Sequence, residues 1–361
     1  ELPLLQSYGY RIPEDLAVLG CFDTVTRGKP ESTLSSLDIR PELIINKIWV
    51  RHGSVAVAAA EVAGCVGSNE FPTFEFRPER VLPRWVHWYS KTQALWNKCD
   101  ALSQGTSGKN RIRPERFLTI EIPLPPLETQ RRIVARIDRL AARIGEAAAA
   151  AYETDKLADG LLLAAYQRIA ESAPRRPLGD IAPLTRRPAT IDANKDYPQV
   201  SVRSFGKGTF HNPPLHGSEI TWQKPHLVKN GDILVSNIKA WEGAIAVAGP
   251  EDDGRYGSHR YLTFVPVDGV ATASFLCFHL LSPEGLYHVG EASPGSADRS
   301  RTLSARAMLE IPVPVPPYEQ QLWFGRVLSR MNEVHKLRRE AAAARDAMLP
   351  SILDRAFKGT P

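Results

Sequence analysis

The chain has 361 residues, of which 43% are hydrophobic and 24% are charged, an ordinary composition for globular domains. Its net charge of +5 permits nucleic-acid binding without demanding it. No apolar run approaches the roughly 18 residues of a membrane span, the first residues do not look like a signal peptide, and the 4 cysteines show no CxxC spacing. These features exclude a membrane or disulfide-rich secreted protein and predict a cytoplasmic one with reduced thiols.

Residues 1–38 form an atypical N-terminal segment, because they match nothing later in the chain. Within this segment, residues 9–24 look like a fragment of the sugar-sensing lobe of LacI-type repressors. Sixteen residues cannot build that lobe. A ligand-responsive transcription factor is therefore only a remote alternative.

Residues 39–126 are predicted to form a first mixed α/β domain. Residues 43–45 are a short apolar run typical of a buried strand, Gly53 suits a turn, and residues 54–57 are the expected returning strand. Residues 85–89 begin a predicted amphipathic helix. Because residues 1–38 do not resemble the residues that open the second repeat, we expect the first domain to lack its opening strands and to be incomplete.

Residues 127–173 are predicted to form one long helix. A proline-rich segment ends at Pro126 and marks where the helix starts, since proline cannot continue a helix backwards. Roughly 40 residues at a rise of 1.5 Å would give a rod of about 60 Å. Apolar residues recur at alternating steps of four and three, the seam spacing of a coiled coil. The pairing residues predicted from this spacing are Ile133, Ile137, Leu140 and Ile144.

A repeat of this plan follows in residues 174–361. Residues 42–57 align without a gap on residues 232–247, an offset of 232 − 42 = 190, and the proline-rich segments match within one residue of that offset. A second mixed α/β domain is therefore predicted over 174–316 and a second long helix over 317–361. The predicted pairing residues of the second helix are Val327, Met331, Val334 and Leu337, with a stutter near Leu337 and a kink or end at Pro350. The fold class is α+β, with two mixed domains separated by two long antiparallel coiled-coil helices in a pseudo-twofold repeat.

Catalytic motifs are weak in this sequence. The segment Asn212-Pro-Pro-Leu215 resembles an adenine-methyltransferase motif but has leucine at the aromatic position, and no Gly-rich cofactor loop precedes it. The segment from Gly105 to Asn110 lacks the spacing of a P-loop. The histidines show no HExxH or i, i+4 pair, and no nucleophile–base set is evident. The sequence predicts no catalytic residues, no metal site and no cofactor on this chain.

Basic, polar and aromatic residues instead gather in one stretch of each repeat. Arg and Lys neutralise phosphates or pair with guanine, and Asn pairs with adenine. A solvated surface is the alternative for any single residue, whereas the repeated set favours a DNA-binding face. The candidates are Lys47, Trp49, Arg51, His52, Lys109, Asn110, Arg111 and Arg113 in the first repeat, and Arg203, Lys207, Asn237, Lys239, Trp241, His259, Arg260, Arg299 and Arg301 in the second.

The doubled pattern resembles the specificity (S) subunit of type I restriction–modification enzymes. Three segments carry the resemblance: residues 122–134, their copy at 311–324, and residues 349–359. Residues 44–53 also look like the strand and loop of a target recognition domain. The likeness covers about residues 39–361.

This resemblance implies a non-catalytic subunit for DNA recognition and assembly. Two target recognition domains would each bind one half of a split site in double-stranded DNA, and the paired helices would fix the gap between half-sites. Methyltransferase (M) subunits would carry S-adenosylmethionine, and restriction (R) subunits would add translocation driven by ATP and Mg. The atypical N-terminus leaves an alternative open, a decayed S subunit that acts only as an assembly scaffold.

Overall fold

The structure, a computed structural model, describes residues 35–36, 42–58, 62, 65–105, 110–221, 224–295 and 301–358. Contacts divide the chain into two compact units. Unit 1 comprises Glu1–Tyr152 and Arg338–Pro361, and unit 2 comprises Glu153–Leu337. Each unit therefore contains one globular domain, part of the first long helix and part of the second. The atypical segment 1–38, with the repressor-like fragment 9–24, lies outside the described residues except for Ser35–Ser36.

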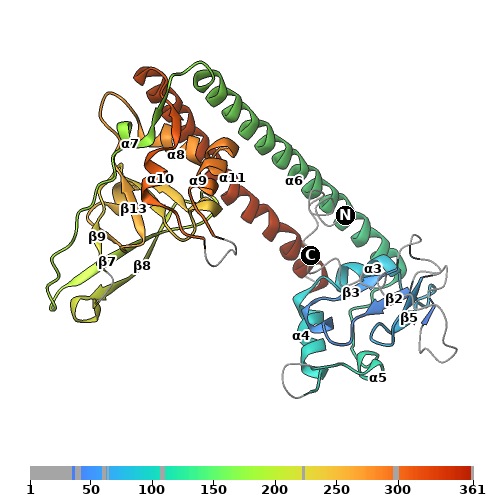
Figure 1. Cartoon of the computed structure of the whole chain (residues 1–361). Helices are drawn as coiled ribbons and strands as arrows, with labels where there is room; N and C mark the ends of the chain where they lie inside the picture. Colours follow the sequence, from blue (N-terminus) through green and yellow to red (C-terminus); the bar gives the residue numbers. More distant parts are fainter. Residues whose placement is uncertain are drawn as a thin grey trace, which may run out of the picture. The chain divides into compact units, whose positions relative to one another are not determined.

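Unit 1 is built on a small antiparallel sheet of order β3-β2-β5, with helices packed beside it (Figure 1). β2 is buried along its whole length, as expected for the central strand of a sheet with an apolar run. The sheet strands are β2 (Glu42–Ile45), β3 (Val55–Val57) and β5 (Thr73–Glu75), the helices are α3 (Pro83–Tyr89), α4 (Gln93–Leu102) and α5 (Pro114–Phe117), and a separate short pair is β1 (Ser35–Ser36) with β4 (Val66–Gly67).

Unit 2 repeats this plan and adds a second sheet. Its antiparallel sheet has the order β11-β10-β13, and a four-stranded sheet of order β8-β7-β12-β9 lies beside it. The first sheet and its helices are β10 (Ile233–Ser236), β11 (Ile245–Val247), β13 (Tyr261–Phe264), α8 (Ala273–Leu281), α9 (Pro283–Glu291) and α10 (Ala305–Leu309). The remaining elements are β6 (Arg175–Pro177), α7 (Leu178–Ile181), β7 (Asp196–Val202), β8 (Thr209–His216), β9 (His226–Leu227), β12 (Tyr256–Gly257) and β14 (Pro312–Pro314).

The strand registers of the two units agree residue for residue. Leu43 of β2 faces Phe74 of β5, and Ile233 of β10 faces Phe264 of β13, so both partners are displaced by 190 residues. The pairing of each central strand with its other neighbour obeys the same offset. Because a slip of one residue would turn every side chain to the opposite face, this agreement confirms the internal repeat.

A buried glutamine joins each globular domain to its long helix. Gln130 accepts a hydrogen bond from the Leu82 N–H at 2.9 Å and donates to two backbone carbonyls, at 3.0 and 2.7 Å. Gln321 accepts from the Thr272 N–H at 2.9 Å and also donates to two carbonyls, at 2.9 and 2.8 Å. Both side chains are almost completely buried. These two glutamine clamps use the amide fully and fix each helix start against its own domain.

The long helices are α6 (Leu127–Ala170) and α11 (Tyr318–Phe357), and they run antiparallel within each unit (Figure 1). In unit 1, Ile137 near the start of α6 packs in the same core as Leu353 near the end of α11. In unit 2, Tyr166 near the end of α6 packs with Phe324 near the start of α11, with ring centroids 6.0 Å apart. The α+β fold with two long paired helices is confirmed.

The seam between the long helices differs from the predicted one. Ile137 is buried, and Ile133, Ile144, Val327 and Met331 are half-buried as a pairing face requires. Leu140 is also half-buried, whereas Val334 and Leu337 are exposed, and Leu337 is 64% exposed. The inward positions instead follow an unbroken heptad without a stutter: 134, 137, 141, 144, 148, 151, 155, 158 and 162 in α6, and 324, 328, 331, 335, 338, 342, 345 and 349 in α11.

The core at the end of α11 explains why the seam has this phase. The Phe357 ring packs edge-on against Trp85 at 4.6 Å and against Tyr89 at 5.1 Å, which fixes the rotation of α11 in unit 1. Pro350 was expected to kink or end the helix, but α11 continues to Phe357. Leu353, one turn beyond the proline, is buried in this core, and its packing stabilises the helix after the proline.

Candidate nucleic-acid interface

The loops that follow β2 and β10 occupy matched places in the two units. Each begins with a 3₁₀ turn, Val50–His52 in unit 1 and Ala240–Glu242 in unit 2. Each turn ends at a glycine with a positive φ, 91° at Gly53 and 73° at Gly243. A Cβ atom at Gly53 would lie 2.7 Å from the Trp96 ring, so a larger residue does not fit. The backbone of the two turns is therefore alike, but the aromatic residue changes place, because Trp49 corresponds to Lys239 and Arg51 corresponds to Trp241.

Four basic side chains of unit 1 line one pocket of about 350 Å³, here called the basic pocket. Three of them, Lys47, Arg111 and Arg113, were predicted as DNA-binding residues. The fourth, Arg116, was missed, although it lies on the helix directly after Arg113. The Ile112 N–H donates to the Lys47 carbonyl at 2.9 Å and holds the two segments together. Such a concentration of cations suits a phosphate group.

Only one of the four basic side chains in the basic pocket contacts a carboxylate of the described residues. Arg111 contacts the Glu70 carboxylate at 3.2 Å, and both side chains are partly exposed. Among the residues that the structure describes, no carboxylate lies within ion-pair distance of Lys47, Arg113 or Arg116. Asn110 directly precedes Arg111 in sequence and is half-buried. Lys109 lies outside the described residues.

An exposed aromatic residue stands on the turn of unit 1. Trp49 is 54% exposed, and its ring centroid lies 5.6 Å from that of His52. The Arg51 Nε donates to the His52 Nε2 at 3.0 Å. A large exposed ring next to cationic groups suits contact with a base or sugar. The structure thus brings the three predicted residues of this turn together.

In unit 2 the matching turn carries a cation–aromatic cluster, formed by Lys239, Trp241 and Arg301. The Lys239 Nζ lies 5.2 Å and the Arg301 guanidinium 5.0 Å from the Trp241 ring centroid. Lys239 also donates to the Glu242 carboxylate at 2.6 Å, and this hydrogen bond lowers the pKa of Glu242. Arg301 donates to the Gly290 carbonyl in the last turn of α9 and to the Ser293 carbonyl just after this helix. The arginine is therefore held in place against the ring.

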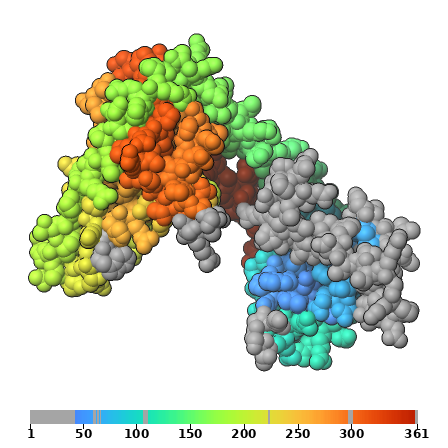
Figure 2. Space-filling model, in the orientation of Figure 1, coloured from blue at the N-terminus to red at the C-terminus, as the bar shows by residue number. Residues whose placement is uncertain are grey.

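The turn between β7 and β8 lies against this cluster, and both strands lie at the surface of unit 2 (Figure 2). The Phe205 N–H donates to the Glu242 carbonyl at 2.8 Å. Phe205 is 72% exposed, and the predicted residue Lys207 lies over its ring at 5.7 Å. The other predicted residue of this turn, Arg203, lies over the Phe210 ring at 4.8 Å. Both phenylalanines were missed, although each neighbours a Gly-Lys-Gly turn in sequence.

Two buried polar atoms near the same loop have no hydrogen-bond partner among the described residues. They are Asn237 Oδ1 and Trp241 Nε1, one acceptor and one donor. The backbone of Asn237 is fully engaged, because its N–H donates to the Arg260 carbonyl and its carbonyl accepts from Leu303. An unpaired buried polar atom is costly, so this loop holds one donor and one acceptor that the described residues leave unsatisfied.

The remaining predicted residues of unit 2 are placed less tightly. Arg260 is exposed and His259 is half-buried at the end of the loop before β13. His259 also helps to lower the pKa of His226, after burial and Arg186. Arg299 lies outside the described residues.

Metal and membrane features were searched in the described part of the chain. No group of three or more His, Cys, Asp or Glu residues there could hold a metal ion. No described helix is long and apolar enough to cross a membrane.

Comparisons with known proteins agree with the geometry of the two units. Residues 51–148 match the family model "Type I restriction modification DNA specificity domain". None of the curated protein sequences compared with this chain matches it.

Solved structures with the same fold cover most of the chain. The HsdS subunit of Thermoanaerobacter tengcongensis is 19% identical, with a TM-score of 0.52, over 92% of this chain and 84% of that chain. A chain from a study of complex assembly and conformational transition in a type I R-M system is 18% identical, with a TM-score of 0.67, over 92% and 85%. At this identity the likeness establishes the fold alone. Together with the matched domain, it confirms the resemblance to type I specificity subunits.

Proposed function

We propose that this chain, with a specificity domain at residues 51–148 and the fold of type I specificity subunits, is the DNA-recognition subunit of a type I restriction–modification complex. The observation that supports it best is the pair of matched turns, in each of which one basic and one aromatic residue occupy the same two backbone positions, in exchanged order. Each unit would bind one half of a split site in double-stranded DNA.

The chemistry of the complex would lie on other subunits. The chain itself would be non-catalytic, and M subunits docked on it would supply S-adenosylmethionine and the methyl transfer. R subunits would bring ATP and Mg, and the complex would act in the cytoplasm. A rigid link between two half-site contacts raises their combined affinity through effective concentration and rejects wrongly spaced sites.

Methylation of a randomised DNA library by the chain with its M subunit tests this proposal. We expect methyl groups at one bipartite sequence, with two fixed halves and a gap of constant length. Methylation without any sequence preference would refute recognition. Protection of only one half-site in a footprint would favour the alternative of a decayed scaffold.

A second measurement tests the basic pocket directly. The change Arg116→Ala should weaken DNA binding and reduce the slope of log affinity against log salt by about 1, because one phosphate contact is lost. Arg139→Ala, at an exposed position of α6 in the same unit, is the matched control and should leave the slope unchanged. If both variants and the unchanged chain show the same slope of log affinity against log salt, the basic pocket does not contact DNA.

A further inference from the structure

An apolar pocket of about 220 Å³ opens in the core of unit 1, and its lining shares no residue with that of the basic pocket. Its volume exceeds the ~150 Å³ of an engineered cavity that takes up benzene. Two of its lining residues are unusually exposed for leucine, Leu118 at 67% and Leu124 at 41%. The other apolar lining residues are Leu43, Val55, Phe74, Phe76, Val81, Val86, Tyr89, Leu95, Phe117, Ile120 and Ile122.

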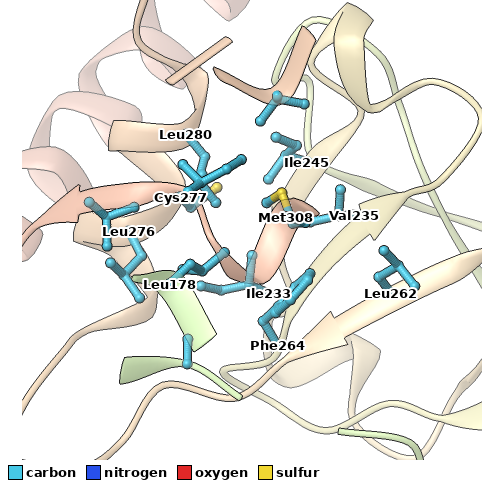
Figure 3. Close-up of a cluster of buried hydrophobic side chains, with 14 of the residues drawn as sticks. Leu178, Ile233, Val235, Ile245, Leu262, Phe264, Leu276, Cys277, Leu280 and Met308 are labelled. Atoms are coloured by element: carbon cyan, nitrogen blue, oxygen red, sulfur yellow. The ribbon is translucent and has the colours of Figure 1, made fainter. Parts of the chain in front are cut away.

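The same place in unit 2 is filled by the chain itself. Leu178 and Ile181, from the single helical turn α7, are completely buried in the main core of unit 2. Figure 3 shows Leu178 among the other side chains of this core. The residues around them are the repeat counterparts of the pocket lining. Phe74 corresponds to Phe264 (264 − 74 = 190), and Val86 corresponds to Leu276 (276 − 86 = 190).

The counterpart of the exposed Leu118 shows which segment covers the matching part of the core in unit 2. The segments 113–130 and 304–321 align without a gap at an offset of 191, so Leu118 corresponds to Leu309. A Cβ atom at Gly179 of α7 would lie 3.0 Å from the Leu309 side chain. Leu309 is therefore covered by α7, whereas Leu118 is left exposed.

The backbone of unit 2 also binds this segment. β6 pairs antiparallel with β14, the Leu178 N–H donates to the Ile311 carbonyl at 2.9 Å, and the Val267 N–H donates to the Ile181 carbonyl at 2.8 Å. At the offset of 191, the counterpart of β14 is the segment 121–123, and that of Ile311 is Ile120. Within the described residues, segment 121–123 belongs to no strand, so its edge can accept one.

We propose that the apolar pocket of unit 1 is a docking site for a peptide segment with the chemistry of Arg175–Ala182. The segment adds a strand along residues 121–123 and inserts a leucine and an isoleucine three residues apart into the pocket. Glycine after the leucine allows the turn to approach Leu118, as Gly179 approaches Leu309. Strand addition supplies backbone hydrogen bonds, and the two side chains supply specificity.

Titration of a fluorescent peptide into the full chain tests this proposal. The peptide carries residues 174–183 of this chain, and anisotropy measures its binding. We expect saturable binding to one site. A peptide with Leu178→Asp and Ile181→Asp should bind more than about tenfold more weakly, because two aliphatic side chains are no longer buried.

Variants of the full chain locate the binding site. Leu118→Asp should weaken binding of the unchanged peptide by at least about tenfold, and the exposure of Leu118 makes the variant compatible with folding. Leu161→Asp is the matched control, since Leu161 on α6 is 70% exposed and lies in unit 2. It should leave binding unchanged.

Three results would overturn the proposal. They are the absence of saturable binding, binding that is insensitive to Leu118→Asp because the peptide enters unit 2 instead, and equal loss of binding in the Leu161→Asp control. None of these results depends on DNA, so the docking site and the proposed function fail or stand separately.

Discussion

Unit 1 and unit 2 place the same strands in the same register but differ on both sides of that framework. On the side of the matched turns, unit 1 has an open basic pocket, whereas unit 2 holds Arg301 between Trp241 and backbone carbonyls. On the core side, unit 1 has an apolar pocket where unit 2 buries Leu178 and Ile181. The sheet register tolerates little change, because a slip would expose the core, while loops can vary freely. Two units with one framework can therefore present two different surfaces.

The largest expected effect comes from the start of the helix seam. Ile137→Asp places an unpaired charge in the core of unit 1 and should lower the free energy of unfolding of unit 1 by about 3–5 kcal/mol. Ala142→Asp, five residues further along α6 at an exposed position, should change it by less than about 0.5 kcal/mol. Urea denaturation followed by the tryptophan fluorescence of unit 1 measures both. Similar losses for the two variants would contradict the observed seam.

A pH-dependent loss of stability should follow for unit 2. Burial lowers the pKa of His279 from 6.5 to about 4, with Arg175 and His288 acting in the same direction and Glu284 opposing them. The folded state therefore favours the neutral ring, whose Nδ1 lies 2.6 Å from the Tyr166 hydroxyl. Stability is fully present above pH 6.5 and is lost as the pH falls towards 4, by roughly 3 kcal/mol in total.

Denaturation midpoints at pH 7 and pH 4.5 measure this loss. His279→Gln should remove most of the pH dependence of the unit 2 transition. Unit 1 offers a matched comparison, because burial, followed by Arg84 and Lys91, also lowers the pKa of His87 to about 4. His87→Gln should act on the unit 1 transition only. A pH dependence that persists in the His279→Gln variant would assign it to other groups.

The smallest effect concerns the glutamine clamps and tests how alike the units are. Gln130→Ala and Gln321→Ala should each destabilise their own unit by about 2 kcal/mol, because each leaves an N–H and two carbonyls unpaired. Thermal unfolding measures the two variants, with Glu128→Ala on the same turn as the exposed control. If only one of the two glutamine variants lowers the stability of its unit, the clamps have the same geometry but contribute different free energies.

Much of the fold could be predicted because the repeat constrains it twice. The buried runs at 43–45 and 233–235 both became central strands, and both proline-rich segments precede long helices. The phase of the seam could not be predicted with the same success. In α11 the apolar pattern favours Val334 and Leu337, which are exposed, whereas the neighbouring polar residues at 335 and 338 are half-buried. Packing of Phe357 against Trp85 fixes the rotation of α11 in unit 1, and that contact joins residues too distant in sequence to be foreseen.

The candidate site was predictable by residue type but not by arrangement. Lys47 and Arg113 were chosen for their charge, and the structure brings both to one pocket. Arg116 was missed because nothing in its local pattern distinguishes it from a solvated helix charge. Phe205 was missed because only the contact of its backbone with Glu242 brings the β7–β8 turn to the interface. Residue chemistry identifies candidates, whereas their grouping depends on long-range backbone contacts.

The glutamine clamps have a mechanical consequence. The first turn of a helix ordinarily frays, since its amides lack partners within the helix. In α6 and α11 this turn is instead tied by side-chain hydrogen bonds to the segment that begins α3 or α8. A force applied along either long helix would therefore be transmitted directly to the adjoining domain, because the first turn of the helix does not unwind before the domain is strained.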